Sequence, residues 1–221
     1  MRSRFPSTAA PLIVALALAG GLERSTTAQY ARPGSNLADQ LEWENSRLRL
    51  TRLAVAPGAA APAGSDRVLV YLTADPEGRM PAAEAVWQPA GSGDLQNRGH
   101  ARLEAIAIEL KDAPPGTSAG TPPEALSASD RADVWRLIDN SRVLVTKHRY
   151  APTTYVDPLH FHPQDALVVY LRGGYAFPAA ADWWGSYRVR RGDVDVIPAN
   201  TFHTMSNPGG DPLEFLMIMP R

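Results

Sequence analysis

The sequence contains no cysteine, which excludes disulfide bonds, thiolate metal ligands and a cysteine nucleophile. A metal site in this protein must therefore be built from histidine and carboxylate ligands. Excess charge is also absent, because 22 Lys and Arg residues stand against 23 Asp and Glu residues, for a net charge of −1. A chain without a basic excess lacks the electrostatic footprint of nucleic-acid binding, so we expect no nucleic-acid partner.

The N-terminus lacks an apolar run long enough to cross a membrane. Arg2 and Arg4 precede the run LIVALALAGGL at 12–22, and the polar stretch ERSTTAQ follows it. Eleven residues rise only about 16 Å as a helix, which is too short for a hydrocarbon core. The order of charged, apolar and small residues predicts a secretory signal peptide over 1–28, with a buried helix of the folded domain as the alternative. We therefore expect a periplasmic or secreted protein with no membrane span in its mature form.

The rest of the chain contains one sequence written twice, because four pairs of segments align in the same order. Their offsets grow from 95 to 110 residues, and the pairs are 45–58 with 140–153, 66–72 with 165–171, 86–91 with 196–200, and 97–110 with 207–220. A duplication with small insertions explains this order. We expect one repeat over 29–110, a Pro-, Gly- and Ala-rich linker over 111–133, and a second repeat over 134–221.

Within each repeat the apolar runs are short and rich in Val, Ile, Leu and Tyr, with Pro and Gly turns between them. This pattern predicts an all-β fold, either a sandwich or a barrel. The segment RADVWRLIDN at 131–140 is predicted as a short helix leading into the second repeat. NLADQLEWEN at 36–45 occupies the same place before the first repeat.

Three of the five histidines fall in two short segments of the second repeat. His160 and His162 are separated by one residue, so on a strand both side chains would point to the same face. The other segment contains in order Gly192, Pro198, His203 and Asn207. A third histidine on a facing strand would complete a triangular set of imidazole ligands with open positions, as a catalytic metal needs.

These two segments resemble the two motifs of the cupin family, a His-x-His pair and then a Gly, a Pro, a third His and an Asn. Asn200 stands where a glycine is usual. The resemblance implies two tandem cupin-type β-barrels of the jelly-roll type, and His160, His162 and His203 as ligands of one divalent metal. It also implies a fourth ligand, a glutamate, at a position that is Ala166 here. The neighbouring Asp165 would turn away from the histidines unless a bulge intervenes.

The first repeat serves as an internal control for the site. His160, His162 and His203 align with Ala61, Ala63 and Asp94, so all three ligands are absent together. Loss as a set is expected if the three act as a set, and we expect no metal in the first repeat.

Two further differences between the repeats indicate candidate catalytic residues. His148 and Tyr150 stand where the first repeat has Leu53 and Val55. Apolar counterparts suggest that both positions face the barrel interior, where His148 could be a fourth ligand or a general acid or base. A water-exposed edge histidine is the alternative.

The second repeat also carries a ten-residue insertion with an aromatic cluster. These aromatics could form a wall over the metal or pack between the repeats, and they are Tyr175, Phe177, Trp183, Trp184 and Tyr187.

Three functions fit this sequence. The first is an exported metalloenzyme that acts on a small organic molecule. Without the glutamate the site resembles the three-histidine iron oxygenases among cupins, so Fe(II)-dependent dioxygenation is favoured. Zn, Ni and Mn are the other candidate ions. The second is a metal-dependent isomerase or lyase, which would use the same ligands. The third is a non-catalytic module that binds a small molecule or a metal. The sequence leaves open whether the repeats pair within one chain or across a homodimer.

Overall fold

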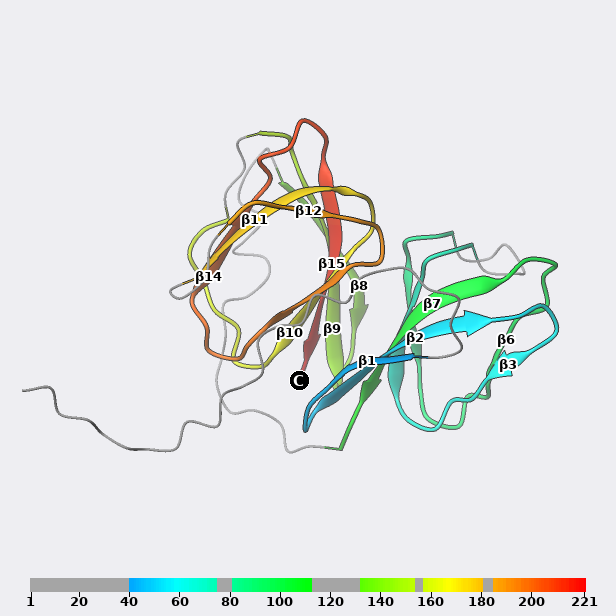
Figure 1. The fold of residues 1–221 in the computed structure, drawn as a ribbon. Coiled ribbons are helices and arrows are strands. Elements are labelled where there is room, and N and C mark those ends of the chain that lie inside the picture. Colours follow the sequence, from blue (N-terminus) through cyan, green and yellow to red (C-terminus); the bar gives the residue numbers. More distant parts are fainter. Residues whose placement is uncertain (1–39, 75–80, 113–131, 154–156, 181–184) are drawn as a thin grey trace, which may run out of the picture.

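A computed structural model describes residues 40–74, 81–112, 132–153, 157–180 and 185–221 (Figure 1). The predicted signal peptide and most of the predicted linker lie outside these residues. The described residues form strands and no helix, so the prediction of an all-β fold is confirmed. None of these residues belongs to a helix that could cross a membrane.

The N-terminal half contains a five-stranded antiparallel sheet in the order β1-β2-β7-β4-β5. Its strands are β1 (Gln40–Glu44), β2 (Leu48–Val55), β7 (Leu103–Leu110), β4 (Arg67–Tyr71) and β5 (Ala85–Gln88). A short pair, β3 (Ala60–Ala61) and β6 (Leu95–Gln96), faces it.

The C-terminal half is a barrel of two facing sheets (Figure 1). The larger sheet has the order β8-β9-β15-β10-β13, with β8 (Ala132–Asp139), β9 (Val143–Tyr150), β15 (Leu213–Pro220), β10 (Ala166–Tyr170) and β13 (Val194–Ile197). The smaller sheet has the order β12-β11-β14, with β12 (Tyr187–Val189), β11 (Gly174–Ala180) and β14 (His203–Ser206).

The two large sheets have the same strand order at the offsets found in the sequence, since β2, β4, β5 and β7 correspond to β9, β10, β13 and β15. Their loops repeat too. The Asn45 side-chain oxygen accepts hydrogen bonds from the backbone N–H groups of Arg47 and Leu48, and Asn140 does the same for Arg142 and Val143. The duplication is therefore present in the hydrogen bonds as well as in the sequence.

A buried asparagine closes the same turn in both halves. The Asn97 Nδ2 donates to the carbonyl oxygens of Val55 and Ala101, and its oxygen accepts from Gly99 N. In the C-terminal half Nδ2 of Asn207, its counterpart, donates to the carbonyls at 150, 151 and 211 and its oxygen accepts from the N–H at 209. These contacts satisfy backbone carbonyls that would otherwise be buried without partners.

The predicted helix over 131–140 is wrong, because its residues form β8. This strand pairs with β9 from Ala132↔Tyr150 to Asp139↔Leu144, with a register shift between Arg136 and Ile138. β1 occupies the same place beside β2. In both cases the segment pairs with a strand whose N–H and C=O groups would otherwise form an open sheet edge, and this pairing overrides the local helical pattern.

The two large sheets pack face to face within this one chain. Their shared apolar core includes Leu50, Val70 and Ile106 from the N-terminal half and Val169 and Leu216 from the C-terminal half. β4 and β10 are buried at every position, which shows that both faces of each strand are covered.

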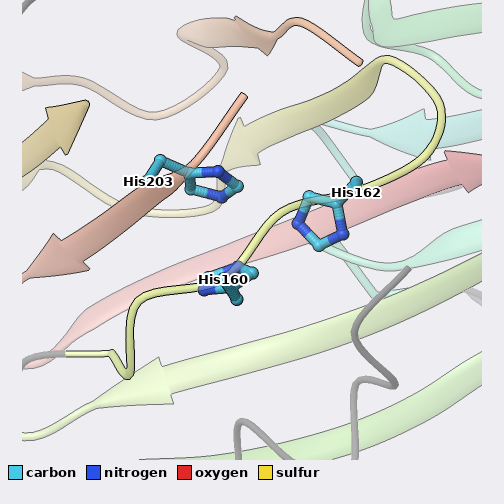
Figure 2. Close-up of side chains that lie close together, drawn as sticks. All are labelled: His160, His162 and His203. Atoms are coloured by element: carbon cyan, nitrogen blue, oxygen red, sulfur yellow. The ribbon is translucent and has the colours of Figure 1, made fainter. Parts of the chain in front are cut away.

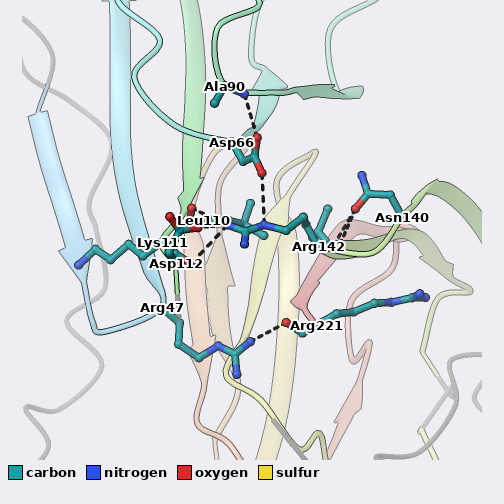
Figure 3. Close-up of polar contacts among 10 residues, drawn as sticks. Arg47, Asp66, Ala90, Leu110, Lys111, Asp112, Asn140, Arg142 and Arg221 are labelled. Carbon is teal, nitrogen blue, oxygen red and sulfur yellow. Dashed lines mark hydrogen bonds and ion pairs between the residues drawn. The ribbon is translucent and has the colours of Figure 1, made fainter. Parts of the chain in front are cut away.

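Reciprocal polar contacts surround this shared core (Figure 3). Arg47 donates to the carbonyl oxygen of Arg221 at 2.7 Å, and its counterpart Arg142 donates to the carbonyl of Leu110 at 3.1 Å. Arg142 also forms an ion pair with Asp66 at 3.2 Å. The two halves thus contact each other in nearly the same way from both sides.

Candidate metal centre

Three histidines that are far apart in the sequence lie together inside the C-terminal barrel. His160 and His162 belong to the segment that precedes β10, and His203 begins β14. A two-residue bridge joins the segments, because the backbone N–H groups of His160 and His203 each donate to the carbonyl of the other. All three side chains are at most 3 % exposed.

The three imidazoles surround one small space (Figure 2). Their ring centroids are 4.2 Å apart for His160 and His203, 5.0 Å for His160 and His162, and 5.1 Å for His162 and His203. One nitrogen from each ring lies within 4.8 Å of the others. Nitrogens at these separations can bind one ion together.

Backbone carbonyls fix the tautomer of two of these rings. His160 Nδ1 lies 2.8 Å from the carbonyl oxygen of Pro158, and His203 Nδ1 lies 2.8 Å from that of Thr201. A carbonyl only accepts, so each Nδ1 carries the proton and each Nε2 presents a lone pair. The Nε2 atoms of His160 and His162 are buried without a hydrogen-bond partner. Such orphaned acceptors are what a metal would satisfy.

Burial keeps these histidines neutral. It lowers the pKa of His162 to about 3 and that of His203 to about 4, and it also lowers the pKa of His160. Charge repulsion among the rings lowers the pKa of His162 and His203 further. Neutral imidazole is the form that binds a metal.

His148 lies inside the barrel beside this group and is fully buried, so the exposed alternative is excluded. Its ring stacks on Phe215 at 4.9 Å, and its Nε2 shares a 2.8 Å hydrogen bond with the hydroxyl of Thr146. Its Nδ1 is buried without a partner. Burial, with a smaller contribution from His160, lowers its pKa to about 3. Tyr150 is also buried and contacts Phe215 edge-on at 5.0 Å.

A family model for the cupin domain matches residues 147–219, which contain the three histidines. The C-terminal barrel, which this model covers, is a cupin domain. No curated protein matches the sequence.

Solved cupin structures resemble this fold at low sequence identity. A cupin 2 conserved barrel domain protein from Leptotrichia buccalis has a TM-score of 0.55 and 13% identity, covering 86% of this chain and 92% of that chain. Salicylate 1,2-dioxygenase from Pseudaminobacter salicylatoxidans has a TM-score of 0.57 and 10% identity, covering 78% and 70%. Oxalate decarboxylase from Bacillus subtilis, whose Mn(II) centres are described, has a TM-score of 0.54 and 13% identity, covering 79% and 69%.

The fourth ligand that cupins can supply is absent here. Ala166 is buried at the start of β10 and offers no ligand atom. Asp165 turns away from the site and accepts hydrogen bonds from the Asn45 side chain and the backbone N–H of Ala199. Within the described part of this chain, the group of side chains that could hold a metal ion consists of the three histidines alone.

The N-terminal half has apolar residues at the positions that correspond to the three histidines. Ala61 faces Leu95 across the β3–β6 pair, as His160 faces His203. The counterpart of His203 is thus Leu95, and the predicted counterpart Asp94 was wrong by one residue. Sequence alignment missed this shift because no identical residue marks the β6 segment.

A buried arginine also distinguishes the N-terminal half. Arg67 is 1% exposed and alternates along β4 with the core residues Leu69 and Tyr71, so it points to the same inner face. It donates to Gln88 at 2.6 Å and to the carbonyl of Pro62 at 2.8 Å. Its counterpart in the C-terminal barrel is Ala166.

The aromatic insertion divides between the surface and the barrel. Tyr175 is 49% exposed, whereas Tyr187 packs against the barrel core. Phe177 lies on β11 and is partly buried, and Trp183 and Trp184 lie outside the described residues. Tyr187 contacts Asp195, a residue that the sequence analysis did not single out. The counterpart of Asp195 in the first repeat is Val86. A search for charged residues that replace apolar ones between the repeats would therefore have found Asp195.

Proposed function

We propose that this chain is a bicupin whose C-terminal barrel holds one divalent metal ion on His160, His162 and His203. The observation that carries the proposal is the convergence of three buried, neutral imidazoles, two of which have Nε2 atoms without partners. This donor set fits a metal ion, and imidazole suits Fe, Zn, Ni and Cu. The N-terminal half, with no ligand at any of the three positions, serves as a scaffold.

We propose further that the protein is a metal-dependent enzyme acting on a small organic molecule, with Fe(II)-dependent dioxygenation as the favoured reaction. When bound, the metal would supply Lewis-acid or redox chemistry at coordination positions that three ligands leave open. The resemblance to salicylate 1,2-dioxygenase supports this choice only at the level of the fold. The predicted signal peptide over 1–28 supports an exported protein, periplasmic or secreted.

The chain's own residues give the remaining parts of the site. The carbonyls of Pro158 and Thr201 orient two ligands. An apolar barrel interior, with Phe215, Met217 and Met205, limits the water around a bound molecule. His148 is neutral and buried, and its Nδ1 has no hydrogen-bond partner, so this atom would be the one to hydrogen-bond a bound molecule.

Metal analysis by mass spectrometry tests the site. We expect about one metal ion per chain in the protein that lacks residues 1–28, and loss of the ion in His160→Ala/His203→Ala. His100→Ala is the matched control, because His100 is exposed in the N-terminal half and should leave the metal content unchanged. No bound metal after reconstitution with Fe, Mn, Zn or Ni would rule out the metal centre.

Dioxygen uptake then separates an oxygenase from a binding module. The iron-loaded protein should consume dioxygen with at least one member of a panel of diketones, phenols and thiols, and His148→Ala should slow that reaction without removing the metal. Full metal content with no uptake across the panel would instead favour a module that binds a small molecule.

A further inference from the structure

A partly buried carboxylate lies on the inner face of the C-terminal barrel, apart from the histidines. Asp195 on β13 accepts a hydrogen bond from the Tyr170 hydroxyl at 2.7 Å and another from the Tyr187 hydroxyl. Tyr170 belongs to the barrel core and Tyr187 packs against that core. Two phenol groups that donate to the same carboxylate oxygen favour its ionised form.

This carboxylate has no cation beside it in the described part of the chain. The pKa of Asp195 is raised above its usual value, because the effect of desolvation outweighs the two tyrosine hydroxyls, which lower it, and the nearby Asp193 raises it further. No lysine, arginine or histidine is among the groups that shift its pKa. Buried charges in proteins are normally paired or bound to a metal, because an isolated one is costly.

The strand register relates Asp195 to the position at which cupins can supply a carboxylate ligand. Ala166, where other cupins can supply a carboxylate ligand, pairs with Ile197, and Asp195 is two residues further along β13, opposite Val168. Two residues on a strand span about 7 Å, and both positions face the same side. A row of rings also links the two places, since Tyr170 contacts Phe215 and Phe215 stacks on His148.

The N-terminal half shows the opposite arrangement of charge. At the position of Asp195 it has Val86, and at the position of Ala166 it has the buried Arg67. One half therefore contains its own cation and has no metal ligands. The other contains an unpaired anion beside three neutral ligands.

We propose that Asp195, held by Tyr170 and Tyr187, is the counter-charge of the metal centre and replaces at longer range the carboxylate that Ala166 does not provide. This inference rests on the proposed metal site. Three neutral imidazoles leave the charge of a divalent ion unreduced, and a fixed carboxylate within the same low-dielectric interior stabilises it. Asp195 is a positioning and tuning residue in this scheme, without direct contact to the metal.

Metal affinity measured with Zn²⁺ or Co²⁺ alone, in competition with a chromophoric chelator, tests the proposal. We expect Asp195→Asn to weaken binding by about 10-fold, because the substitution removes a negative charge from the interior of the same barrel. Tyr170→Phe should weaken it less, because one of the two hydrogen bonds remains. Tyr71→Phe is the matched control in the N-terminal half, at the position equivalent to Tyr170, and should leave the affinity unchanged.

Thermal unfolding of the metal-free and metal-loaded forms distinguishes this role from a structural one. Asp195→Asn should leave the Tm of the metal-free protein equal or higher, because it removes a partly buried charge that has no cation beside it, and should reduce the rise in Tm on metal addition. A lower metal-free Tm with an unchanged metal-induced rise would indicate a structural role and overturn the proposal.

The failures of the two proposals are distinguishable. Equal metal affinity in the natural protein and Asp195→Asn would overturn the proposed role of Asp195 and would leave the proposed metal site unaffected. Absence of metal binding in the natural protein would overturn both.

Discussion

At the scale of single residues, the centre depends on histidines that the fold keeps neutral. His148 and His162 have pKa values of about 3, and His203 of about 4, mainly because burial disfavours the charged ring. Unfolding returns each ring to an ordinary value near 6.5. The unfolded chain therefore binds more protons than the native protein between about pH 6.5 and pH 4.

This difference predicts acid sensitivity of the metal-free protein. The stability from each neutral histidine is present above about pH 6.5 and falls by about 1.4 kcal/mol per pH unit as the pH drops toward the folded pKa. Urea unfolding at a series of pH values from 7.5 to 5 measures the slope.

The control for this prediction is His160→Ala/His203→Ala, which removes two such groups. Its free energy of unfolding should change less steeply with pH, whatever its value at pH 7.5. Parallel slopes for the two proteins would contradict the assigned protonation states.

The sequence was sufficient to predict that His160, His162 and His203 lie together, because a repeat without them supplied a comparison. It was not sufficient for Arg67 and Asp195. A single charged residue in a strand is usually solvated. Arg67 is unusual because it is fully buried, and Asp195 because it is partly buried with no opposite charge beside it. Such surroundings exist only after the chain has folded.

At the scale of elements, the short apolar runs between turn residues predicted an all-β fold, but β8 was predicted as a helix. Its sequence has apolar residues at 134, 135, 137 and 138, a spacing that fits a helix as well as a bulged strand. The segment forms a strand because it pairs with the backbone groups at the edge of β9, which would otherwise have no partners. Trp135 remains 44% exposed and lies near Lys147, with its ring centroid 6.0 Å from the ammonium.

The two buried asparagines provide a matched test of the turns between elements. Asn207→Ala leaves three carbonyl oxygens and one N–H without their partner and should lower the free energy of unfolding by about 2–3 kcal/mol. Asn97→Ala should have a similar effect, since it removes the same kinds of contact. Urea unfolding measures both.

Metal affinity separates these two variants. Asn207 follows β14, the strand that carries His203, so Asn207→Ala should weaken metal binding as well. Asn97→Ala should retain the natural affinity. A loss of affinity in Asn97→Ala alone would be inconsistent with a site confined to the C-terminal barrel.

At the scale of the whole molecule, the shared core makes the two halves one cooperative unit. Leu216 is fully buried between the large sheets and contributes to the core that contains residues of both. Neither half can unfold alone without exposing this apolar face to water.

Calorimetry checks this cooperativity. We expect one unfolding transition, and Leu216→Ala should lower stability by about 2–5 kcal/mol while the transition stays single. Leu137→Ala, at a position 36% exposed, should change stability little. Two separate transitions, only one of which moves, would show that the halves unfold independently.

The buried arginine of the N-terminal half has a consequence for how the protein depends on its surroundings. Arg67 is part of the chain, so that half receives its cation at synthesis and keeps it. If the C-terminal barrel holds a metal as proposed, it would obtain that ion from the medium, in competition with other consumers of trace metals. Metal starvation would then empty the C-terminal site and leave the N-terminal half with its cation in place.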